Sequence, residues 1–196
     1  GYLFDQFLNR SSNLRTDAWG GPIENRARLL LDTTTAVCRA IGADRVGVRI
    51  SPLGTFNDVH DPQPELIYRH LATQLSTFGL AYLHVIRPTV SGSMTVSTTM
   101  TTDPLPELRS LYTGTLIVAG DLDVAHADAL VDAGLADAIG FGRWFIGNPD
   151  LPNRLQNGLE LEMAERSIYY SEGARGYADF PRCEKKIAHD CVGRVA

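Results

Sequence analysis

Four short apolar runs alternate with helical patterns along the chain, and this order constrains the fold more than any other feature. The apolar runs cover residues 46–50, 81–86, 115–119 and 136–141. Helical patterns cover residues 24–42, 64–78, 104–112, 124–133 and 151–156, with expected loops at 53–63 and 89–102. Such alternation is typical of parallel βα units. The predicted fold class is therefore α/β, with uninterrupted apolar strands in a sheet covered by helices on its outer face. The sheet is either open or half of an eight-stranded barrel.

The composition excludes several classes of protein. A chain of 196 residues with a net charge of −5 can bury one substantial core. Mild acidity without a basic cluster argues against nucleic acid as a partner, and no apolar run is long enough to cross a membrane. Three cysteines make no even disulfide framework, which favours a reducing, cytoplasmic location. Cys183, His189 and Cys191 could suggest a metal site, but they lack a fourth ligand.

Two of the apolar runs end in glycine, at Gly120 and at Gly142, which is followed by Arg143. Glycine lets a backbone approach a ligand closely and offers bare N–H groups. In parallel α/β barrels the loops after the last two strands commonly bind phosphate. We therefore predict that Gly120, Gly142 and Arg143 bind a phosphorylated cofactor or substrate. The alternative is a pair of ordinary turn glycines. Asp121 is expected to cap the helix that follows.

Charged and titratable residues inside the apolar runs are further candidates. Arg49 lies within a predicted strand, where burial without a partner would be costly. It is either one half of a core salt bridge or a cation beside a ligand anion at the barrel mouth. His84, also within a strand, is expected to be a hydrogen-bonded structural histidine. Residues 25–28 are expected to form a structural network at the start of a helix.

Longer blocks of the sequence resemble a known family. GYLFDQFLNRSSNLRTDAWGGPIENRARLLLD, DRVGVRISP, AYLHVIRP and GFGRWFIGNPDLPNRL are similar to the C-terminal half of Old Yellow Enzyme, the FMN-dependent ene-reductases. The resemblance covers residues 1–181 and leaves 182–196 as a tail of unknown role. It implies a (β/α)8 TIM barrel that carries FMN, to which this chain supplies about four βα units, strands five to eight. We therefore expect a fragment or a processed chain, whose partner is a missing N-terminal half-barrel.

The resemblance also implies an activity, namely NAD(P)H-dependent reduction of activated C=C bonds in a small α,β-unsaturated substrate. Tyr2, in GYL, matches the family's proton donor, although a tyrosine near a terminus is often a packing or surface residue. Arg49 would contact the flavin and stabilise its anionic reduced form. Tyr177, in GARGYADFP, would lie near flavin or substrate, or else pack as a tail residue on the barrel.

Two other functions stay open. The first is a non-catalytic half-barrel that binds phosphate or FMN weakly, or that complements the missing half. Its open sheet edges would invite pairing. The second is a different FMN barrel with other substrates, against which the NPDL block argues.

Overall fold

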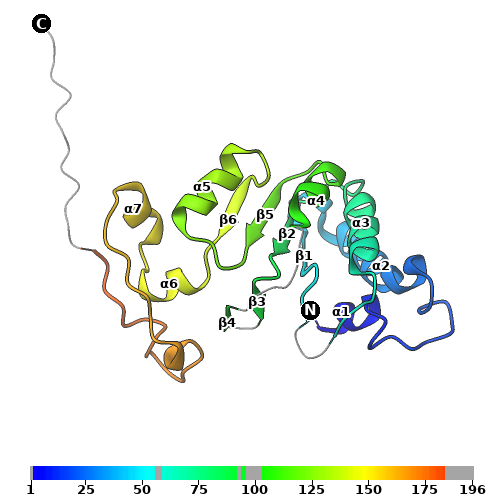
Figure 1. Ribbon diagram of the computed structural model, residues 1–196, viewed down its shortest axis with the longest axis horizontal. Coiled ribbons are helices and arrows are strands. Elements are labelled where there is room, and N and C mark those ends of the chain that lie inside the picture. Colours follow the sequence, from blue (N-terminus) through cyan, green and yellow to red (C-terminus); the bar gives the residue numbers. More distant parts are fainter. Residues whose placement is uncertain (1, 56–58, 92–93, 96–102, 184–196) are drawn as a thin grey trace, which may run out of the picture. The chain divides into compact units, whose positions relative to one another are not determined.

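The computed structural model describes residues 2–55, 59–91, 94–95 and 103–183 (Figure 1). It divides into two compact units, Gly1–Gly140 and Phe141–Ala196. Most of the expected tail at 182–196, including His189 and Cys191, lies outside the described residues. The boundary expected at residue 181 marks where the family resemblance ends, whereas the division at Gly140 separates two compactly packed units. The two boundaries describe different things, so the one at residue 181 stays a prediction.

The first unit is built on a four-stranded parallel sheet in the order β1-β2-β5-β6. Its strands are β1 (Gly47–Ile50), β2 (Tyr82–Ile86), β5 (Leu116–Ala119) and β6 (Ala138–Gly140). The helices are α2 (Ile23–Ile41), α3 (Pro64–Leu75), α4 (Leu105–Leu111) and α5 (Val124–Asp132). Because α3, α4 and α5 each connect two neighbouring parallel strands, the expectation of βα units is confirmed.

The helices of the first unit lie along one side of the sheet (Figure 1). Alternate strand residues point to that side and are almost fully buried against the helices; among them are Val48, Ile50, Leu83, Val85, Leu116 and Val118. Leu71 and Leu75 of α3 and Leu108 of α4 complete this core and are equally inaccessible. Burying such side chains stabilises a fold by about 1.5–3 kcal/mol each. The core therefore holds the strands and helices of this unit together.

The opposite face of the sheet is more polar and more open. The residues of β1 alternate between exposed and buried, and Arg49 is among the exposed ones. The expectation of strands without alternation is therefore wrong for burial, and of the two interpretations of Arg49 the exposed position agrees with a cation beside a ligand, which stays a prediction. The reason is that helices cover only one face of this sheet within the described residues.

Proline, glycine and aspartate fix the ends of the helices. α3 begins at Pro64, whose missing N–H costs nothing in a first turn. α2 ends before Gly42, whose φ of 94° is a conformation that favours glycine. α5 begins after Asp123, whose Oδ1 accepts the His126 N–H at 2.8 Å. Asp121 is not the residue that caps this helix, so that expectation is wrong.

A buried ion pair ties the first helices to the loop before α3. The guanidinium of Arg26 lies 2.6 Å from the carboxylate of Asp61, and both side chains are at most 3% exposed. Arg26 also donates to the carbonyl of Leu8, and Asp61 accepts the Arg10 N–H at 3.1 Å. The structural network expected at residues 25–28 is thereby confirmed for Arg26.

Several short elements have no counterpart in the sequence-based prediction. They are α1 (Tyr2–Leu8), η1 (Ala43–Arg45), α6 (Arg143–Gly147) and η3 (Arg166–Ile168), with an antiparallel pair of strands, β3 (Val90–Ser91) and β4 (Met94–Thr95). A loop throughout 89–102 is therefore a wrong expectation at the four strand residues. Elements of two to seven residues are too short to show a periodic apolar pattern.

The second unit contains α6, α7 (Leu151–Gln156) and η3, and a polar network holds it together. Asn148, which is fully buried, donates to the Trp144 and Glu162 carbonyls at 2.7 Å. Its Oδ1 accepts from the guanidinium of Arg154 at 2.8 Å. Arg154 also binds Asp150 at 2.8 Å and the Pro181 carbonyl at 2.9 Å. The NPDLPNRL block therefore fixes the path of the residues that follow it.

Candidate functional site

Arg49 and His84 are neighbours on the open face of the sheet, paired in register on β1 and β2. Arg49 makes no hydrogen bond or ion pair with the residues that the structure describes, so the predicted core salt bridge is absent from this part of the chain. The Nε2 atom of His84 is buried and has no hydrogen-bond partner among them. The expectation of a hydrogen-bonded histidine is therefore not met at Nε2.

The electrostatics of this pair follow from its position. Burial disfavours the charged imidazole, and the positive charge of Arg49 adds to that effect, so the pKa of His84 is lowered. A Cβ at Gly140 on β6 would lie 3.5 Å from His84 Nε2, an ordinary van der Waals contact, so the ring lies close to the backbone of β6. The open face thus carries one fixed cation beside a neutral imidazole, an arrangement that favours an anionic or electron-rich ligand over a cation.

Gly120 ends β5 in a conformation that other residues rarely adopt, with φ at 125°. A Cβ at this position would lie 2.9 Å from the Cβ of Arg87. The Arg87 N–H donates to the Ala119 carbonyl at 2.8 Å, and the Thr89 hydroxyl donates to the Gly120 carbonyl at 3.1 Å. The loops after β2 and β5 are therefore packed so closely that only glycine fits, which explains Gly120 without a ligand and leaves its phosphate role a prediction.

Gly142 differs from Gly120 because neither its conformation nor its neighbours require glycine. Its φ is −86°, and a Cβ added there would meet nothing within 4 Å. Arg143 follows as the first residue of α6. The open space above Gly142 is compatible with a ligand close to the backbone. Gly120 belongs to the first unit and Gly142 and Arg143 to the second, so their joint phosphate binding stays a prediction.

Tyr2 is the first residue of α1 and its side chain is 63% exposed. α1 packs against α2, the helix that carries Arg26 of the buried ion pair, and this packing positions Tyr2 at the start of α1. An exposed phenol near the end of a helix is accessible to a substrate, but its role as proton donor stays a prediction.

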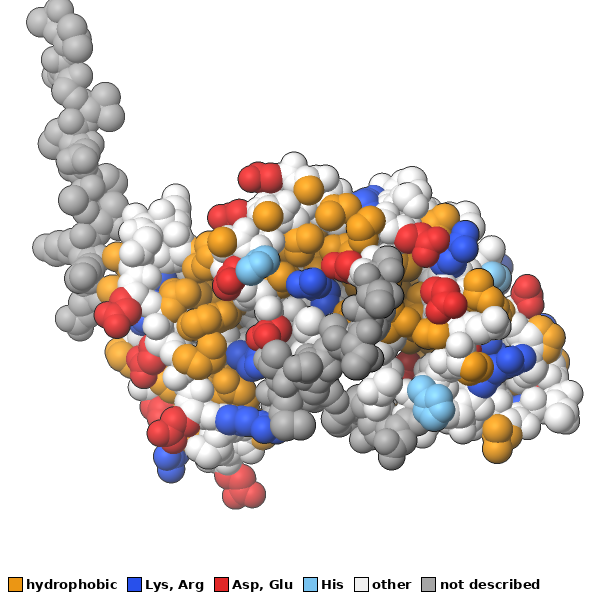
Figure 2. Space-filling view, in the orientation of Figure 1, with side chains coloured by type: hydrophobic (Ala, Val, Ile, Leu, Met, Phe, Trp, Pro, Cys, Tyr) orange, Lys and Arg blue, Asp and Glu red, His pale blue; other side chains and the backbone are white. Residues whose placement is uncertain are grey.

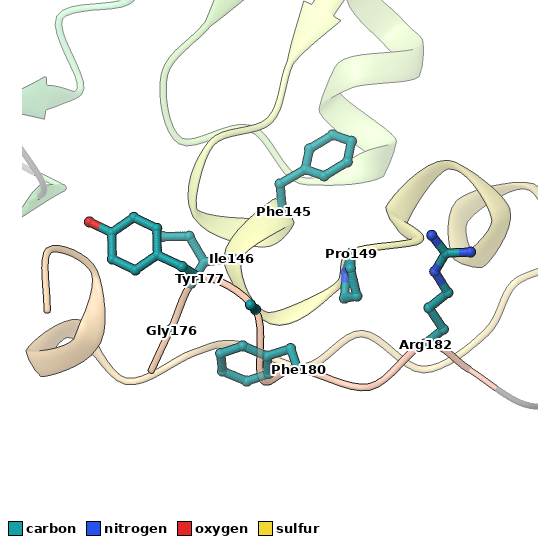
Figure 3. Close-up of a pocket in the computed structure, with 8 residues that line it drawn as sticks. Phe145, Ile146, Pro149, Gly176, Tyr177, Phe180 and Arg182 are labelled. Atoms are coloured by element: carbon teal, nitrogen blue, oxygen red, sulfur yellow. The ribbon is translucent and has the colours of Figure 1, made fainter. Parts of the chain in front are cut away.

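Tyr177 lies in the second unit, at a pocket of about 400 Å³. Figure 2 shows exposed hydrophobic side chains in the region of α6, and Figure 3 shows the pocket itself. Other residues that line it are Phe145, Ile146, Pro149, Gly176, Ala178, Phe180 and Arg182. Pockets of this size accept small organic molecules. Sequence reasoning missed Phe145 and Arg182, although Phe145 lies within the block GRWFIGNPD and Arg182 directly follows GYADFP, two blocks that it had singled out.

The described residues offer no site for a metal ion, because no group of three or more His, Cys, Asp or Glu side chains lies together there. Cys183 instead donates its backbone N–H to Asp150 at 3.0 Å. Burial alone would raise the pKa of the Asp150 carboxyl, but hydrogen bonds from Arg154 and Cys183 outweigh it and lower that pKa. No helix in the described part of the chain is long and apolar enough to cross a membrane.

Comparison with known proteins assigns the family. Residues 1–162 match the NADH:flavin oxidoreductase / NADH oxidase family. The flavin oxidoreductase hxnT of Emericella nidulans is 40% identical over 92% of this chain and 51% of its own length. A probable flavin mononucleotide-dependent alkene reductase of Leishmania infantum is 41% identical over 92% of this chain and 48% of its own length.

Solved structures agree in fold. Morphinone reductase superposes with a TM-score of 0.85 at 38% identity, over 97% of this chain and 50% of that one. The Old Yellow Enzyme homologue from Zymomonas mobilis gives a TM-score of 0.86 at 37% identity, over 92% and 50%. The chain is an α/β protein of the β/α-barrel class that contributes four βα units. It belongs to the NADH:flavin oxidoreductase / NADH oxidase family, the family of Old Yellow Enzyme, and spans about half the length of the curated relatives it matches.

Proposed function

We propose that this chain works in an FMN-dependent NAD(P)H oxidoreductase that reduces activated C=C bonds in small α,β-unsaturated molecules. The observation that carries the proposal is the position of Arg49 on the open face of the sheet, where this cation has no hydrogen-bonding or ionic partner among the described residues. The chain belongs to a family of flavin oxidoreductases, in which such a cation can bind the cofactor. Relatives described as a flavin mononucleotide-dependent alkene reductase and a 12-oxophytodienoate reductase support the class of reaction.

The residues present fit FMN. Arg49 would offer its planar, permanently charged guanidinium to the electron-rich edge of the flavin, beside a histidine kept neutral by burial. The backbone at Gly120 and Gly142 and the side chain of Arg143 would hold the phosphate. FMN, when bound, would supply the hydride-transfer chemistry between NAD(P)H and the alkene.

The chain's own residues would then handle the proton and the substrate. Tyr2 would donate a proton from its phenol to the substrate carbon opposite the one that receives hydride. Tyr177 would contact the substrate from the pocket in the second unit. Both assignments rest on the matching motifs GYL and GYADFP together with the exposure of each side chain, 63% in both cases.

The visible spectrum of the purified chain, recorded after incubation with FMN and removal of free flavin, tests the proposal. Retained yellow colour with a shifted absorption band is expected. An Arg45→Gln variant, which removes an arginine preceding β1, should retain the same colour and controls for loss of charge alone. A chain that remains colourless at every FMN concentration contradicts flavin binding.

A second candidate is a non-catalytic half-barrel that complements a separate N-terminal half-barrel. The observation that favours it is the sheet itself, in which β1 and β6 are both edge strands within the described residues. Unpaired edges and a half-polar face are surfaces that other strands can cover. A colourless chain that forms a stable complex with a separately expressed N-terminal half of a relative would support this candidate.

A further inference from the structure

The pocket beside Tyr177 combines exposed aromatic rings with a cation. Phe145 is 45% and Tyr177 63% exposed, although aromatic side chains usually bury most of their surface. Exposed apolar surface that is gathered around a hollow commonly marks a binding site. Among the residues that the structure describes, no acidic side chain lines this pocket. A ligand ring therefore gains contact area here without meeting a negative charge.

Arg182 gives this apolar pocket its charge. It lines the pocket and makes no ion pair or hydrogen bond through its side chain within the described residues. Arg154 in the same unit differs, because its guanidinium donates to Asn148, Asp150 and the Pro181 carbonyl. Arg182 is thus available to bind a ligand, whereas the hydrogen bonds of Arg154 stabilise the fold of the second unit. Figure 3 shows Phe180 and Pro149 between Tyr177 and Arg182.

We propose that this pocket binds a ring-bearing carboxylate, with the ring against Phe145 and Phe180 and the carboxylate on Arg182. The hydroxyl of Tyr177, which makes no side-chain hydrogen bond in the described part of the chain, is available for a second polar group of the ligand. The proposal deepens the proposed function and rests on it in one respect, namely that the ligand is a substrate of the reductase.

The charge and shape of the pocket favour a carboxylate over a phosphate. One guanidinium matches one carboxylate in both charge and planar fork geometry. A phosphate dianion would require further donors, and Arg182 is the one cationic side chain among the described residues that line the pocket. Apart from Arg182, the described lining offers one side-chain donor, the Tyr177 hydroxyl, so a phosphate would gain fewer charge-assisted contacts for its two charges than a carboxylate gains for its one.

Binding of 2-naphthoate and of its neutral counterpart 2-naphthamide to the full 196-residue chain tests the proposal. The fluorescence of Trp144, which belongs to α6 together with Phe145, and calorimetry both report binding. We expect naphthoate to bind about fivefold more tightly than naphthamide at low salt, since Arg182 is exposed to solvent. Phenyl phosphate should bind no more tightly than benzoate.

The variant Arg182→Gln should abolish the preference for the acid and leave naphthamide affinity within about twofold, because the neutral amide forms no ion pair with Arg182. Arg182→Lys should keep part of the preference. Arg175→Gln provides the matched control, since Arg175 is exposed in the same unit but does not line the pocket. Thermal melting of each variant excludes unfolding as the cause.

Equal affinity for acid and amide, or a preference that survives Arg182→Gln, would overturn the proposal. Tighter binding of phenyl phosphate than of benzoate would overturn the choice of carboxylate. These outcomes are separate from those of the proposed function, because the measurements require neither FMN nor turnover. A chain that retains flavin but shows no preference refutes only the carboxylate pocket.

Discussion

The side chains of Arg26 and Asp61 form an ion pair at 2.6 Å, with exposed fractions of 3% and 1%. The two residues come from α2 and from the loop before α3, which their pairing holds together. Removing one member of such a pair leaves an uncompensated charge away from water. This pair should therefore matter far more to stability than any ion pair on the surface.

Asp61→Ala should lower the free energy of unfolding by about 3–5 kcal/mol, because it leaves the buried guanidinium of Arg26 without its partner. Urea unfolding followed by circular dichroism measures the change. The control is Glu107→Ala, which removes the exposed pair with Arg69 at 3.1 Å and should cost less than about 1 kcal/mol. An equal decrease in the free energy of unfolding for the two variants would show that burial does not strengthen the contribution of the Arg26–Asp61 pair to stability.

The histidine beside Arg49 should make stability depend on pH. The pKa of His84 is lowered by burial and then by the charge of Arg49, so the unfolded chain binds a proton more readily than the folded one. Stability is therefore full above the ordinary histidine pKa of about 6.5 and decreases as the pH falls below it.

Urea titrations between pH 8 and pH 5 should show a smaller loss of stability in His84→Gln than in the unsubstituted chain. His70→Gln, on α3, is the control and should leave the loss unchanged. A pH dependence identical in all three proteins would contradict a neutral His84 in the fold.

Replacing Arg49 with Ala should weaken FMN binding in the complete enzyme. Loss of a charge-assisted hydrogen bond costs about 1.5–3 kcal/mol, which corresponds to a decrease in affinity of roughly 10- to 150-fold. Fluorescence titration of the flavin measures it. Arg49→Lys should recover only part of the affinity, since an ammonium lacks the planar fork. Unchanged affinity in Arg49→Ala would remove Arg49 from the flavin site.

Tyr2→Phe, again in the complete enzyme, should separate the two half-reactions. Flavin reduction by NAD(P)H should remain nearly unchanged, whereas alkene reduction should slow by about 10²–10⁴-fold through loss of the general acid. Stopped-flow spectroscopy follows each half-reaction. Equal slowing of both would show that Tyr2 acts through the structure of α1.

The 196-residue chain alone should not reduce cyclohexenone with NADPH, even where it retains some flavin. Its relatives are about twice as long, and correct positioning of reactants contributes roughly 7–11 kcal/mol to lowering a barrier. Consumption of NADPH and formation of cyclohexanone are the readouts, with a full-length relative as the positive control. Sustained turnover by the chain alone would refute this prediction.

The alternation of strands and helices was predictable because its signals are local. Pro64 begins a helix and Gly42 ends one by their own backbone preferences. The helix cap at Asp123 instead of Asp121 was not predictable, because either side chain has the right chemistry and only the path of the turn decides. The exposure of Arg49 required knowing which face of the sheet carries helices.

Long-range contacts explain the rest of what the sequence could not reveal. Arg26 and Asp61 are 35 residues apart, and nothing local indicates that they meet. Arg182 becomes a candidate binding residue only in the folded chain, where it lines the same pocket as Phe145, 37 residues earlier in the sequence. Among the candidate site residues, Gly120, Gly142, Arg143 and Arg49 came from their places in or after predicted strands, and Tyr2 and Tyr177 from matching motifs. Their chemical roles remain predictions.

The polar network around Asn148 and Arg154 has a consequence for how this fold can diversify. These two side chains hold the segment from Glu160 to Pro181 through its backbone carbonyls, at Glu160, Glu162 and Pro181. Every amino acid supplies that same acceptor, so the course of the segment does not depend on which side chains it carries. Pocket residues such as Tyr177 and Arg182 can therefore be exchanged by mutation while the frame stays in place, and ligand preference can evolve separately from folding.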